Sequence, residues 1–178
     1  MNKKRMTALF CIVCTGIFIT ITFAGCKKNS ETLGPLSGLL VKYEGCKQTA
    51  ANNNNNRGEE VLSTAGNDCL EFDYDGAGTL ALKHIDCGFN CCPGTVTADI
   101  ACNGNQITIT EKESQQGCHC SCLFDLFYEL KNVSPGSYTI RIIEPYISEN
   151  DPVMVFTLEL TSAKSGTLCI ERNHYPWI

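Results

Sequence analysis

An alternation of apolar and polar residues with a period of two recurs along most of this 178-residue chain, and it limits the fold more than any other feature. A β-strand directs successive side chains to opposite faces, so such alternation is typical of strands with one buried face. The pattern predicts an all-β fold, an antiparallel β-sandwich (Ig-like) of eight or nine strands. The clearest strand segments are 70–74, 80–82, 96–102, 105–109, 124–130, 138–142, 154–160 and 168–170.

The strongest local turn signal is Asn103-Gly104, which separates two alternating segments. Both residue types tolerate the positive φ that a two-residue β-hairpin turn requires. With these residues as the turn, the apolar cross-strand partners share one face, so turn chemistry and burial agree. The predicted pairs are Cys102 with Asn105, Ile100 with Ile107, and Ala98 with Ile109.

Two further segments help to define a single sandwich domain, which we expect to span residues 38–178. The run Val133-Ser134-Pro135-Gly136-Ser137-Tyr138 resembles the L-x-P-G-x-Y corner of many bacterial sandwich domains, a resemblance that implies fold but not function. Five consecutive asparagines at 52–56 cannot bury apolar area. We therefore expect residues 47–67 to form a long mobile loop.

The amino end carries an export signal. Three basic residues at positions 3–5 precede an apolar run over 8–25, an order typical of a cleaved signal peptide, here residues 1–25. The segment Phe23-Ala24-Gly25-Cys26 resembles the bacterial lipobox, and this resemblance implies lipid attachment at Cys26. The alternatives are an ordinary signal cleaved near Gly25 and an uncleaved anchor, for which the apolar run is of borderline length.

Removal of the signal leaves 11 basic against 19 acidic residues, a net charge of −8. This balance argues against nucleic acid and anionic surfaces as partners. Residues 26–37 would then be a lipidated tether, with acyl chains holding the protein at a membrane. Lys27 and Lys28 stand where an inner-membrane retention signal would place aspartate, which favours the outer membrane, on its periplasmic or its external face.

Ten cysteines follow Cys26, an even number in a chain expected to enter an oxidising compartment. Both facts favour a disulfide framework, although the count leaves the connectivity open. The candidates are Cys46, Cys69, Cys87, Cys91, Cys92, Cys102, Cys118, Cys120, Cys122 and Cys169.

Residues at every second position of a strand share one face, and this parity limits which cysteines can form disulfides with each other. If the strand over 124–130 extends backwards, Cys118, Cys120 and Cys122 all point into the core. Side chains two residues apart in a strand are too distant for a disulfide or for easy sharing of one zinc ion, so each should reach a different partner. The nearest sources are the run 87–92 and the inward-facing Cys102.

Two other expectations concern the remaining cysteines. Cys91 and Cys92 are adjacent, so they should diverge to two partners rather than bond to each other. Cys69 and Cys169 have outward parity in their strands, and a bond between them, or from Cys46 to either, is a hypothesis.

A metal site is the alternative interpretation of the cysteine clusters. It needs reduced thiolates, which an oxidising compartment opposes, and a bend at Gly117. A thiol-redox enzyme is disfavoured because the mature sequence has no C-x-x-C followed by a helix. The possible ligands for zinc or copper are Cys87, Cys91, Cys92, Cys118, His119, Cys120 and Cys122.

Other reactive residues give no catalytic pattern. The sequence has no G-x-S-x-G, H-E-x-x-H or phosphate-binding glycine loop. His84 continues the inward parity of Leu80 and Leu82, so we expect a satisfied histidine at the edge of the core. His174 belongs to an aromatic tail, 173–178, that we expect to pack on the sandwich. We therefore predict no catalytic residue and no cofactor.

The chain contains, in this order, the segments Phe89-Asn90-Cys91-Cys92-Pro93, 104–109, Cys118-x-Cys120-x-Cys122, Asp125-x-x-Tyr128-Glu129 and His174-Tyr175-Pro176-Trp177. Together these segments resemble a group of uncharacterised cysteine-rich lipoproteins of Bacteroidetes-type bacteria. The resemblance covers about residues 68–178 and implies a secreted β-domain, without an activity. With the lipobox, it predicts a non-enzymatic, membrane-anchored binding or structural module of the cell envelope, with a protein or glycan as partner.

Overall fold

A computed structural model of the protein describes residues 34–47 and 67–172. The predicted signal peptide, Cys26, the asparagine run and the tail that holds His174 lie outside the described residues. Among the described residues, no helix is long and apolar enough to cross a membrane. The strands are β1 (Ser37–Lys47), β2 (Asn67–Tyr74), β3 (Thr79–Asn90), β4 (Val96–Asn103), β5 (Gln106–Glu113), β6 (Ser121–Lys131), β7 (Gly136–Ile143), β8 (Met154–Leu160) and β9 (Lys164–Glu171).

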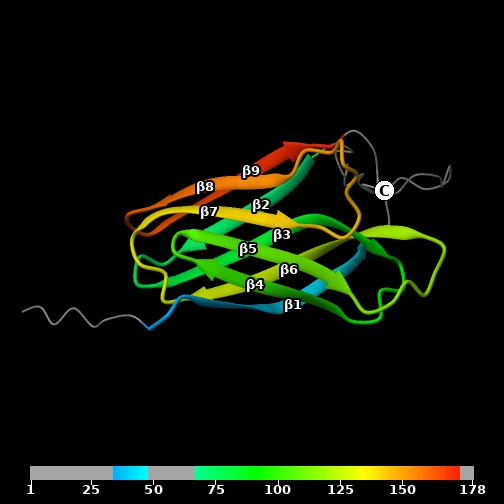
Figure 1. Cartoon of the computed structure of the whole chain (residues 1–178), viewed down its shortest axis with the longest axis horizontal. Helices are drawn as coiled ribbons and strands as arrows, with labels where there is room; N and C mark the ends of the chain where they lie inside the picture. The colour runs from blue at the N-terminus through cyan, green and yellow to red at the C-terminus, as the bar shows by residue number, and fades with distance from the viewer. Residues whose placement is uncertain (1–33, 48–66, 173–178) are drawn as a thin grey trace, which may run out of the picture. The chain divides into compact units, whose positions relative to one another are not determined.

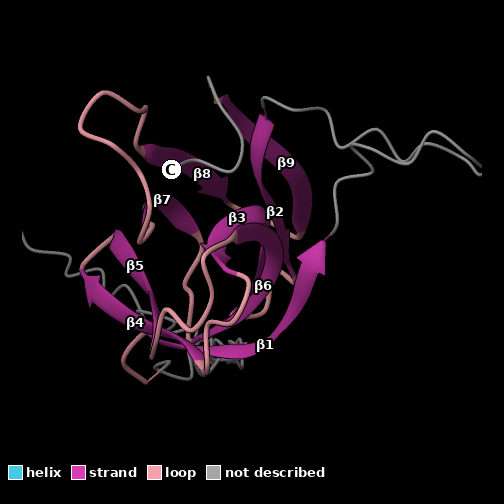
Figure 2. Cartoon of the chain, turned by 90° about the vertical axis from the view of Figure 1, so that its right-hand side faces the viewer, coloured by secondary structure: helices cyan, strands magenta, loops and turns pink. Residues whose placement is uncertain are grey.

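The strands form two sheets that pack face to face (Figure 1). One sheet has the order β1-β6-β3-β2-β9, and the other has the order β4-β5-β7-β8. Figure 2 shows the four-stranded sheet on one side and the five-stranded sheet curving around the other. The prediction of an all-β sandwich is confirmed. The sequence pattern did not reveal β1, because Leu39, Val41 and Tyr43 are exposed and its alternation is not that of a half-buried strand.

The core lies between the sheets and follows the predicted alternation. In β2 the apolar residues are buried while the intervening Glu71 and Asp73 are exposed. Burying a Leu, Ile or Phe side chain contributes roughly 1.5–3 kcal/mol, so the two inner faces hold the sheets together. The largest fully buried side chains are Tyr74, Tyr128, Phe89, Leu70, Leu80, Ile107, Ile109, Leu123, Leu126, Leu130 and Ile140.

One pair of neighbouring strands departs from the antiparallel pattern. β5 and β7 run parallel, with Ile107 opposite Ile140 and Ile109 opposite Ile142. A parallel pair needs a long crossover connection. Here the chain leaves β5, passes through β6 in the other sheet and returns as β7. This crossover places residues at the ends of β5 and β7 side by side, which matters for the site below.

The β4–β5 hairpin forms as predicted, but its register is shifted. Asn103 pairs with Gln106, so Gly104 and Asn105 are the turn residues, one position later than expected. Gly104 has φ 58°, and glycine at the first turn position is typical of a type II′ turn. Moving the turn by one position moves each cross-strand partner by two residues, for example from Ile107 to Ile109 opposite Ile100. An even shift keeps every side chain on its predicted face. The observed pairs are Cys102 with Ile107, Ile100 with Ile109, and Ala98 with Glu111, so the three predicted pairs were wrong.

The corner before β7 fastens one end of the sandwich. The Tyr138 hydroxyl donates to the carbonyl of Ser134 over 2.8 Å. The Tyr74 hydroxyl donates over 2.9 Å to the carbonyl of Val133, which is fully buried. The Val133 amide donates to the carbonyl of Gly78 over 3.0 Å. The corner therefore links β2, the β2–β3 turn and the start of β7.

Candidate functional site

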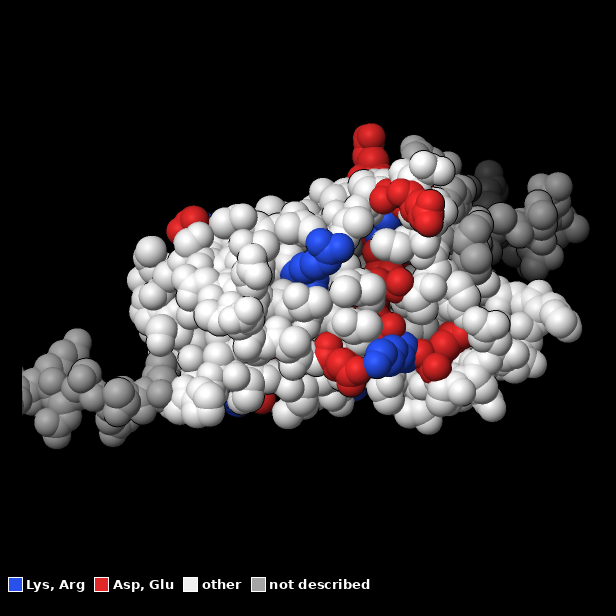
Figure 3. Space-filling view, viewed as in Figure 1, with Lys and Arg blue, Asp and Glu red and all other residues white. Residues whose placement is uncertain are grey.

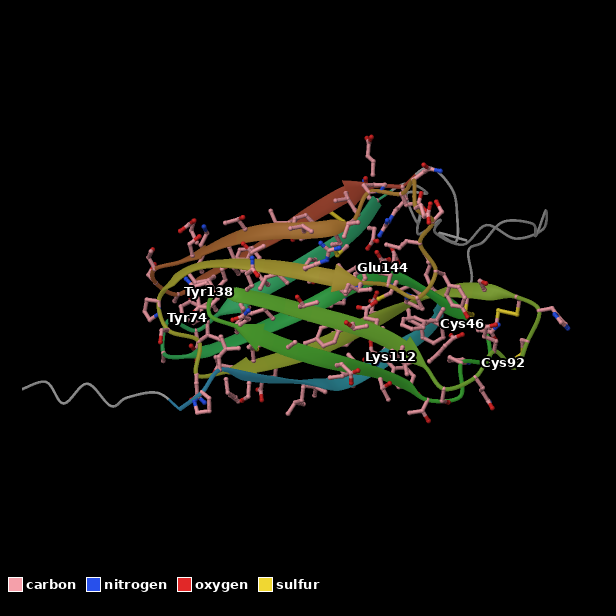
Figure 4. All side chains as sticks on the ribbon, viewed as in Figure 1. Cys46, Tyr74, Cys92, Lys112, Tyr138 and Glu144 are labelled. Carbon is pink, nitrogen blue, oxygen red and sulfur yellow. A yellow bond between two sulfur atoms is a disulfide. The ribbon has the colours of Figure 1, made fainter. Side chains whose placement is uncertain are left out.

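The cysteine-rich loops lie at the end of the sandwich opposite this corner. Figure 4 labels Cys46 and Cys92 there, with Glu144 on the same side and Tyr74 and Tyr138 at the far end. Cys91 and Cys92 bond to two different partners, as predicted. Cys69 and Cys169 face each other across β2 and β9 and are bonded, which is one of the hypothesised pairings, whereas Cys46 bonds neither of them. The four disulfides of the described residues are Cys46–Cys122, Cys69–Cys169, Cys91–Cys120 and Cys92–Cys118.

The course of residues 117–122 differs from the prediction. β6 begins at Ser121, so only Cys122 of the three cysteines lies in the strand and is buried. Cys118 is half-buried and Cys120 is exposed, because the segment turns out of the sheet. The Gly117 amide donates to the carbonyl of Cys92 over 3.1 Å, which draws this segment onto the other cysteine loop.

Asn90 joins the two cysteine loops, a role that the sequence did not reveal. Its Oδ1 accepts hydrogen bonds from the amides of Cys92 (2.9 Å) and Cys118 (3.1 Å). Its Nδ2 donates to the carbonyl of Cys118 over 2.6 Å. An asparagine that bonds the amide two residues on is a common turn former. Asn90 therefore positions the Cys92 and Cys118 backbones beside each other.

Two predicted disulfide residues, Cys87 and Cys102, form no disulfide among the described residues. Five of the other proposed metal ligands, Cys91, Cys92, Cys118, Cys120 and Cys122, are oxidised. A sulfur in a disulfide supplies no thiolate, and thiolate is the form that binds zinc. The predicted cluster site therefore does not assemble in this disulfide-bonded structure, and of its cysteines only Cys87 keeps a thiol.

A β-bulge brings Cys87 to the same face as His84. His84 pairs with Leu126 and Cys87 with Phe124, so three steps along β3 match two steps along β6. The extra residue reverses the parity of the strand, which turns an odd-numbered residue inward. Asp86 lies in the bulge and has φ 67°, a conformation uncommon for a residue other than glycine.

His84 occupies the centre of a buried polar network between the sheets. Its Nε2 lies 2.7 Å from Oδ1 of Asp68, and its Nδ1 lies 2.7 Å from Oε1 of Glu111. The Tyr128 hydroxyl donates to the same Glu111 oxygen over 2.6 Å. His84 and Asp68 are fully buried, and Glu111 is 2 % exposed. The prediction that His84 is an inward-facing, satisfied histidine is confirmed.

Arg172, directly after β9, closes the network on the opposite side of Asp68. Its Nε donates to Oδ2 of Asp68 over 2.9 Å, and its Nη1 donates to the carbonyl of Pro152 over 2.8 Å. Its Nη2 bonds both Asp68 and Glu144. Elements from both sheets thus share one set of charges, with Glu144 following β7 and Glu111 in β5.

The charges of the network perturb one another. Burial alone lowers the pKa of His84, but its interactions with Cys87, Glu111 and Asp68 outweigh burial and hold that pKa well above 6.5. Burial likewise raises the pKa of Asp68, yet His84 and Arg172 bring it below its usual value. Burial raises the pKa of Glu144 to about 8. It also raises the pKa of the Cys87 thiol, so Cys87 is protonated at neutral pH.

The alternation of inward and outward positions in the sequence could have identified two members of this network. Asp68 continues the inward positions of Leu70 and Phe72, and Glu111 continues those of Ile107 and Ile109. A carboxylate at an inward strand position must be paired when buried, so it marks a polar site. Glu144 and Arg172 lie after their strands, where parity gives no information.

A hollow of about 400 Å³ leads from the surface to the two carboxylates at the ends of β5 and β7. Glu111, Glu113, Glu144 and Tyr146 line it. Figure 3 shows acidic side chains gathered on this face of the molecule. Oε2 of Glu111 and Oε1 of Glu144 are buried without a hydrogen-bond partner among the described residues. Glu111 and Glu144 thus line the hollow, and each keeps one buried carboxylate oxygen whose hydrogen bonding is incomplete.

A second hollow, of about 550 Å³, lies on the outer face of the five-stranded sheet. Its floor includes Val41, Ala81 and Phe127, and Val41 is 56 % exposed. The ammonium groups of Lys42 and Lys83 lie 4.2 Å and 5.5 Å from the centre of the Phe127 ring. Lys42 and Lys83 belong to a polar rim around this floor. The other rim residues include Glu71, Asp73, Glu129, Ser165 and Thr167.

Comparisons with protein-family models, curated proteins and solved structures found no match to this chain. The functional argument therefore rests on the two hollows, the buried network and the disulfides.

Proposed function

We propose that the protein is a non-enzymatic lipoprotein of the bacterial cell envelope whose sandwich domain binds a protein partner through the hollow on the five-stranded sheet. The disulfides are the main support for a location in the cell envelope. Four of them join the described residues, and such bonds persist in oxidising compartments but are rare in the cytosol. The basic, apolar and lipobox-like order of residues 1–26 supports export and lipid attachment at Cys26, with the outer membrane favoured.

The chemistry of the outer hollow supports a protein partner. An apolar floor with Val41 and Phe127 is surrounded by charged side chains, the arrangement typical of a protein interface with an apolar core and a polar rim. Lys42 and Lys83 lie towards Phe127, while Glu71 and Asp73 come from β2. Charges of both signs around an apolar floor favour a partner whose own acidic and basic groups flank an apolar side chain.

The buried network supports a role other than catalysis. Both ring nitrogens of His84 bond to carboxylates, and Arg172 bonds Asp68 and Glu144. A general base must reach the proton that it abstracts. His84 is fully buried and already satisfied, so we propose that it stabilises the fold.

Cell fractionation tests the anchor. We expect Cys26→Ser to move the protein from the membrane to the soluble fraction, because the acyl chains are then missing. Cys102→Ser is the matched control and should stay at the membrane. Continued membrane retention of Cys26→Ser would contradict lipid anchoring.

Photo-crosslinking in intact cells tests the binding surface. A photoreactive amino acid at Ala81, in the outer hollow, should give a discrete protein adduct, whereas one at Ala101, exposed in β4, should not. Replacing Lys42 and Lys83 with glutamate should reduce the adduct from Ala81, because the two positive charges of the rim become negative. Equal adducts from both positions, no adduct, or an adduct with carbohydrate alone would overturn the protein-binding proposal.

A further inference from the structure

The most unusual arrangement in the domain is the meeting of His84, Cys87 and Glu111 between the sheets. One ligand atom from each residue lies within 4.8 Å of the others, and all three residues are buried. The bulge at Asp86 brings Cys87 to this face, since regular alternation would direct it outward. Imidazole nitrogen, thiolate sulfur and carboxylate oxygen are the three ligand types that zinc uses in proteins.

We propose that His84, Cys87 and Glu111 form a binding site for a divalent transition-metal ion such as Zn²⁺, entered through the acidic hollow beside Glu144. The unpartnered Oε2 of Glu111 is the second observation behind this site. That carboxylate is 2 % exposed, and Glu111 also lines the hollow that opens to solvent. A buried carboxylate oxygen without a hydrogen bond is stabilised by a cation.

Asp68 occupies the position of a supporting residue for this site. Its Oδ1 lies 2.7 Å from Nε2 of His84, which leaves Nδ1 of the ring directed at Glu111. Metal-binding histidines almost always donate their other ring N–H to a carboxylate or carbonyl, which fixes the tautomer and orients the ring. Arg172 in turn holds Oδ2 of Asp68. The ligands are therefore oriented by partners that lie outside the metal site.

A second group, Asp68, His84 and Glu144, also has ligand atoms within 4.8 Å of one another. There the guanidinium of Arg172 bonds both carboxylates, so a cation is already in place. In the group with Cys87 the positive charge comes from the proton between His84 and Glu111, which a metal ion can displace, and not from a guanidinium. Calcium and magnesium prefer oxygen ligands alone, so the imidazole and the thiol favour zinc or a metal of similar softness.

Metal binding keeps the local charge balanced. His84 carries a proton shared with Glu111, and the Cys87 thiol carries another. A Zn²⁺ ion would displace both protons to solvent and bind a neutral imidazole, a thiolate and a carboxylate. The metal-bound set has the same net charge as the protonated set. A water molecule from the hollow would supply the fourth ligand of a tetrahedral site.

Metal titration of the purified full-length secreted protein, in detergent with its disulfides intact, tests this site. After chelation, we expect one equivalent of Zn²⁺ to bind, and Co²⁺ to give a thiolate-to-metal charge-transfer band. Cys87→Ser should remove this band and weaken Zn²⁺ binding by more than about tenfold, since loss of a supporting residue alone typically weakens it 10–100-fold. Cys102→Ser, at the other cysteine without a disulfide among the described residues, should bind Zn²⁺ like the unchanged protein.

Two results would overturn the proposal: no stoichiometric Zn²⁺ binding by the unchanged protein, or equal binding by Cys87→Ser. X-ray absorption of the zinc-loaded, unchanged protein provides a measurement that does not depend on a variant folding. One sulfur among nitrogen and oxygen ligands is expected. A zinc ion with no sulfur ligand, or with two or more, would contradict this ligand set. These outcomes are independent of the anchoring and crosslinking tests above.

Discussion

Nδ1 of His84 in β3 lies 2.7 Å from Oε1 of Glu111 in β5, so one fully buried charged pair joins the two sheets of the sandwich. Most buried residues between the sheets are apolar. A buried pair of this kind is retained only where each charge has a partner, because desolvation of an unpaired charge is unfavourable by several kcal/mol. Asp68, Arg172 and Tyr128 supply these further partners.

Removal of the histidine should therefore destabilise the domain strongly. In His84→Leu, Asp68 and Glu111 lose their shared partner while both carboxylates remain buried. We expect the free energy of unfolding to fall by about 3–5 kcal/mol. Chemical denaturation of the metal-free, oxidised protein measures this change. His119→Leu, the same substitution in an exposed loop, should change stability by no more than about 0.5 kcal/mol. Equal effects of the two substitutions would show that the buried pairs contribute little.

The oxidation state of the cysteines gives a second prediction. Alkylation of the denatured, unreduced protein should label Cys87 and Cys102 and leave the eight bonded cysteines of the described domain unlabelled. In the native protein Cys102, which is half-buried, should react first. Cys87 is fully buried, so its labelling requires opening of the sandwich. Peptide mass spectrometry locates each label. Label on Cys91 or Cys120 without reduction would contradict the disulfide assignment.

The sequence predicted the sandwich because strand alternation is a local property that each segment carries by itself. The inward positions of β2, such as Leu70 and Phe72, are recognisable without knowledge of their neighbours. Register was less predictable. Asn103-Gly104 and Gly104-Asn105 are both plausible turns that place the same side chains inward, so burial does not distinguish them.

The candidate metal site was less predictable than the fold. Parity identified His84 as an inward residue but gave no position for Cys87, because the bulge between them depends on the pairing of β3 with β6. Similarly, the extension of β6 back to Cys118 assumed a straight strand, whereas Asn90 and the Cys92 carbonyl bind the loop instead. Long-range pairing, rather than local propensity, determined these positions.

Asp125 should make the stability of the domain depend on pH. Its carboxylate contacts Lys47 in β1 and Lys83 in β3, and it accepts a 3.2 Å hydrogen bond from the Asp86 amide. Burial alone raises the pKa of Asp125, but these donors bring it below its usual 3.8. The folded state therefore binds the proton more weakly than the unfolded state. The resulting stabilisation is complete above the unfolded pKa and disappears as pH falls through the folded pKa.

Asp125→Asn measures this contribution. We expect a loss of roughly 1.5–3 kcal/mol at pH 7, typical of hydrogen bonds to a charged group, and a smaller difference from the unchanged protein below about pH 3. Denaturant unfolding across this pH range provides the comparison. Asp99→Asn is the control, since Asp99 pairs with Lys112 on the surface and should contribute no more than about 1 kcal/mol. A pH-independent loss in Asp125→Asn would exclude the charge as its cause.

The bulge at Asp86 provides the last prediction, because it alone directs Cys87 towards His84. A β-branched side chain is strongly disfavoured at φ 67°, whereas glycine adopts this conformation readily. Asp86→Val should therefore lower stability by about 1–3 kcal/mol. Asp86→Gly and Asp86→Asn both remove the 2.7 Å ion pair with Lys47 but tolerate the backbone conformation, so they should lose at most about 1 kcal/mol. Native alkylation of Cys87 reports the bulge directly. It should be faster in Asp86→Val and unchanged in the other two variants, and equal rates in all three would show that the bulge does not depend on residue 86.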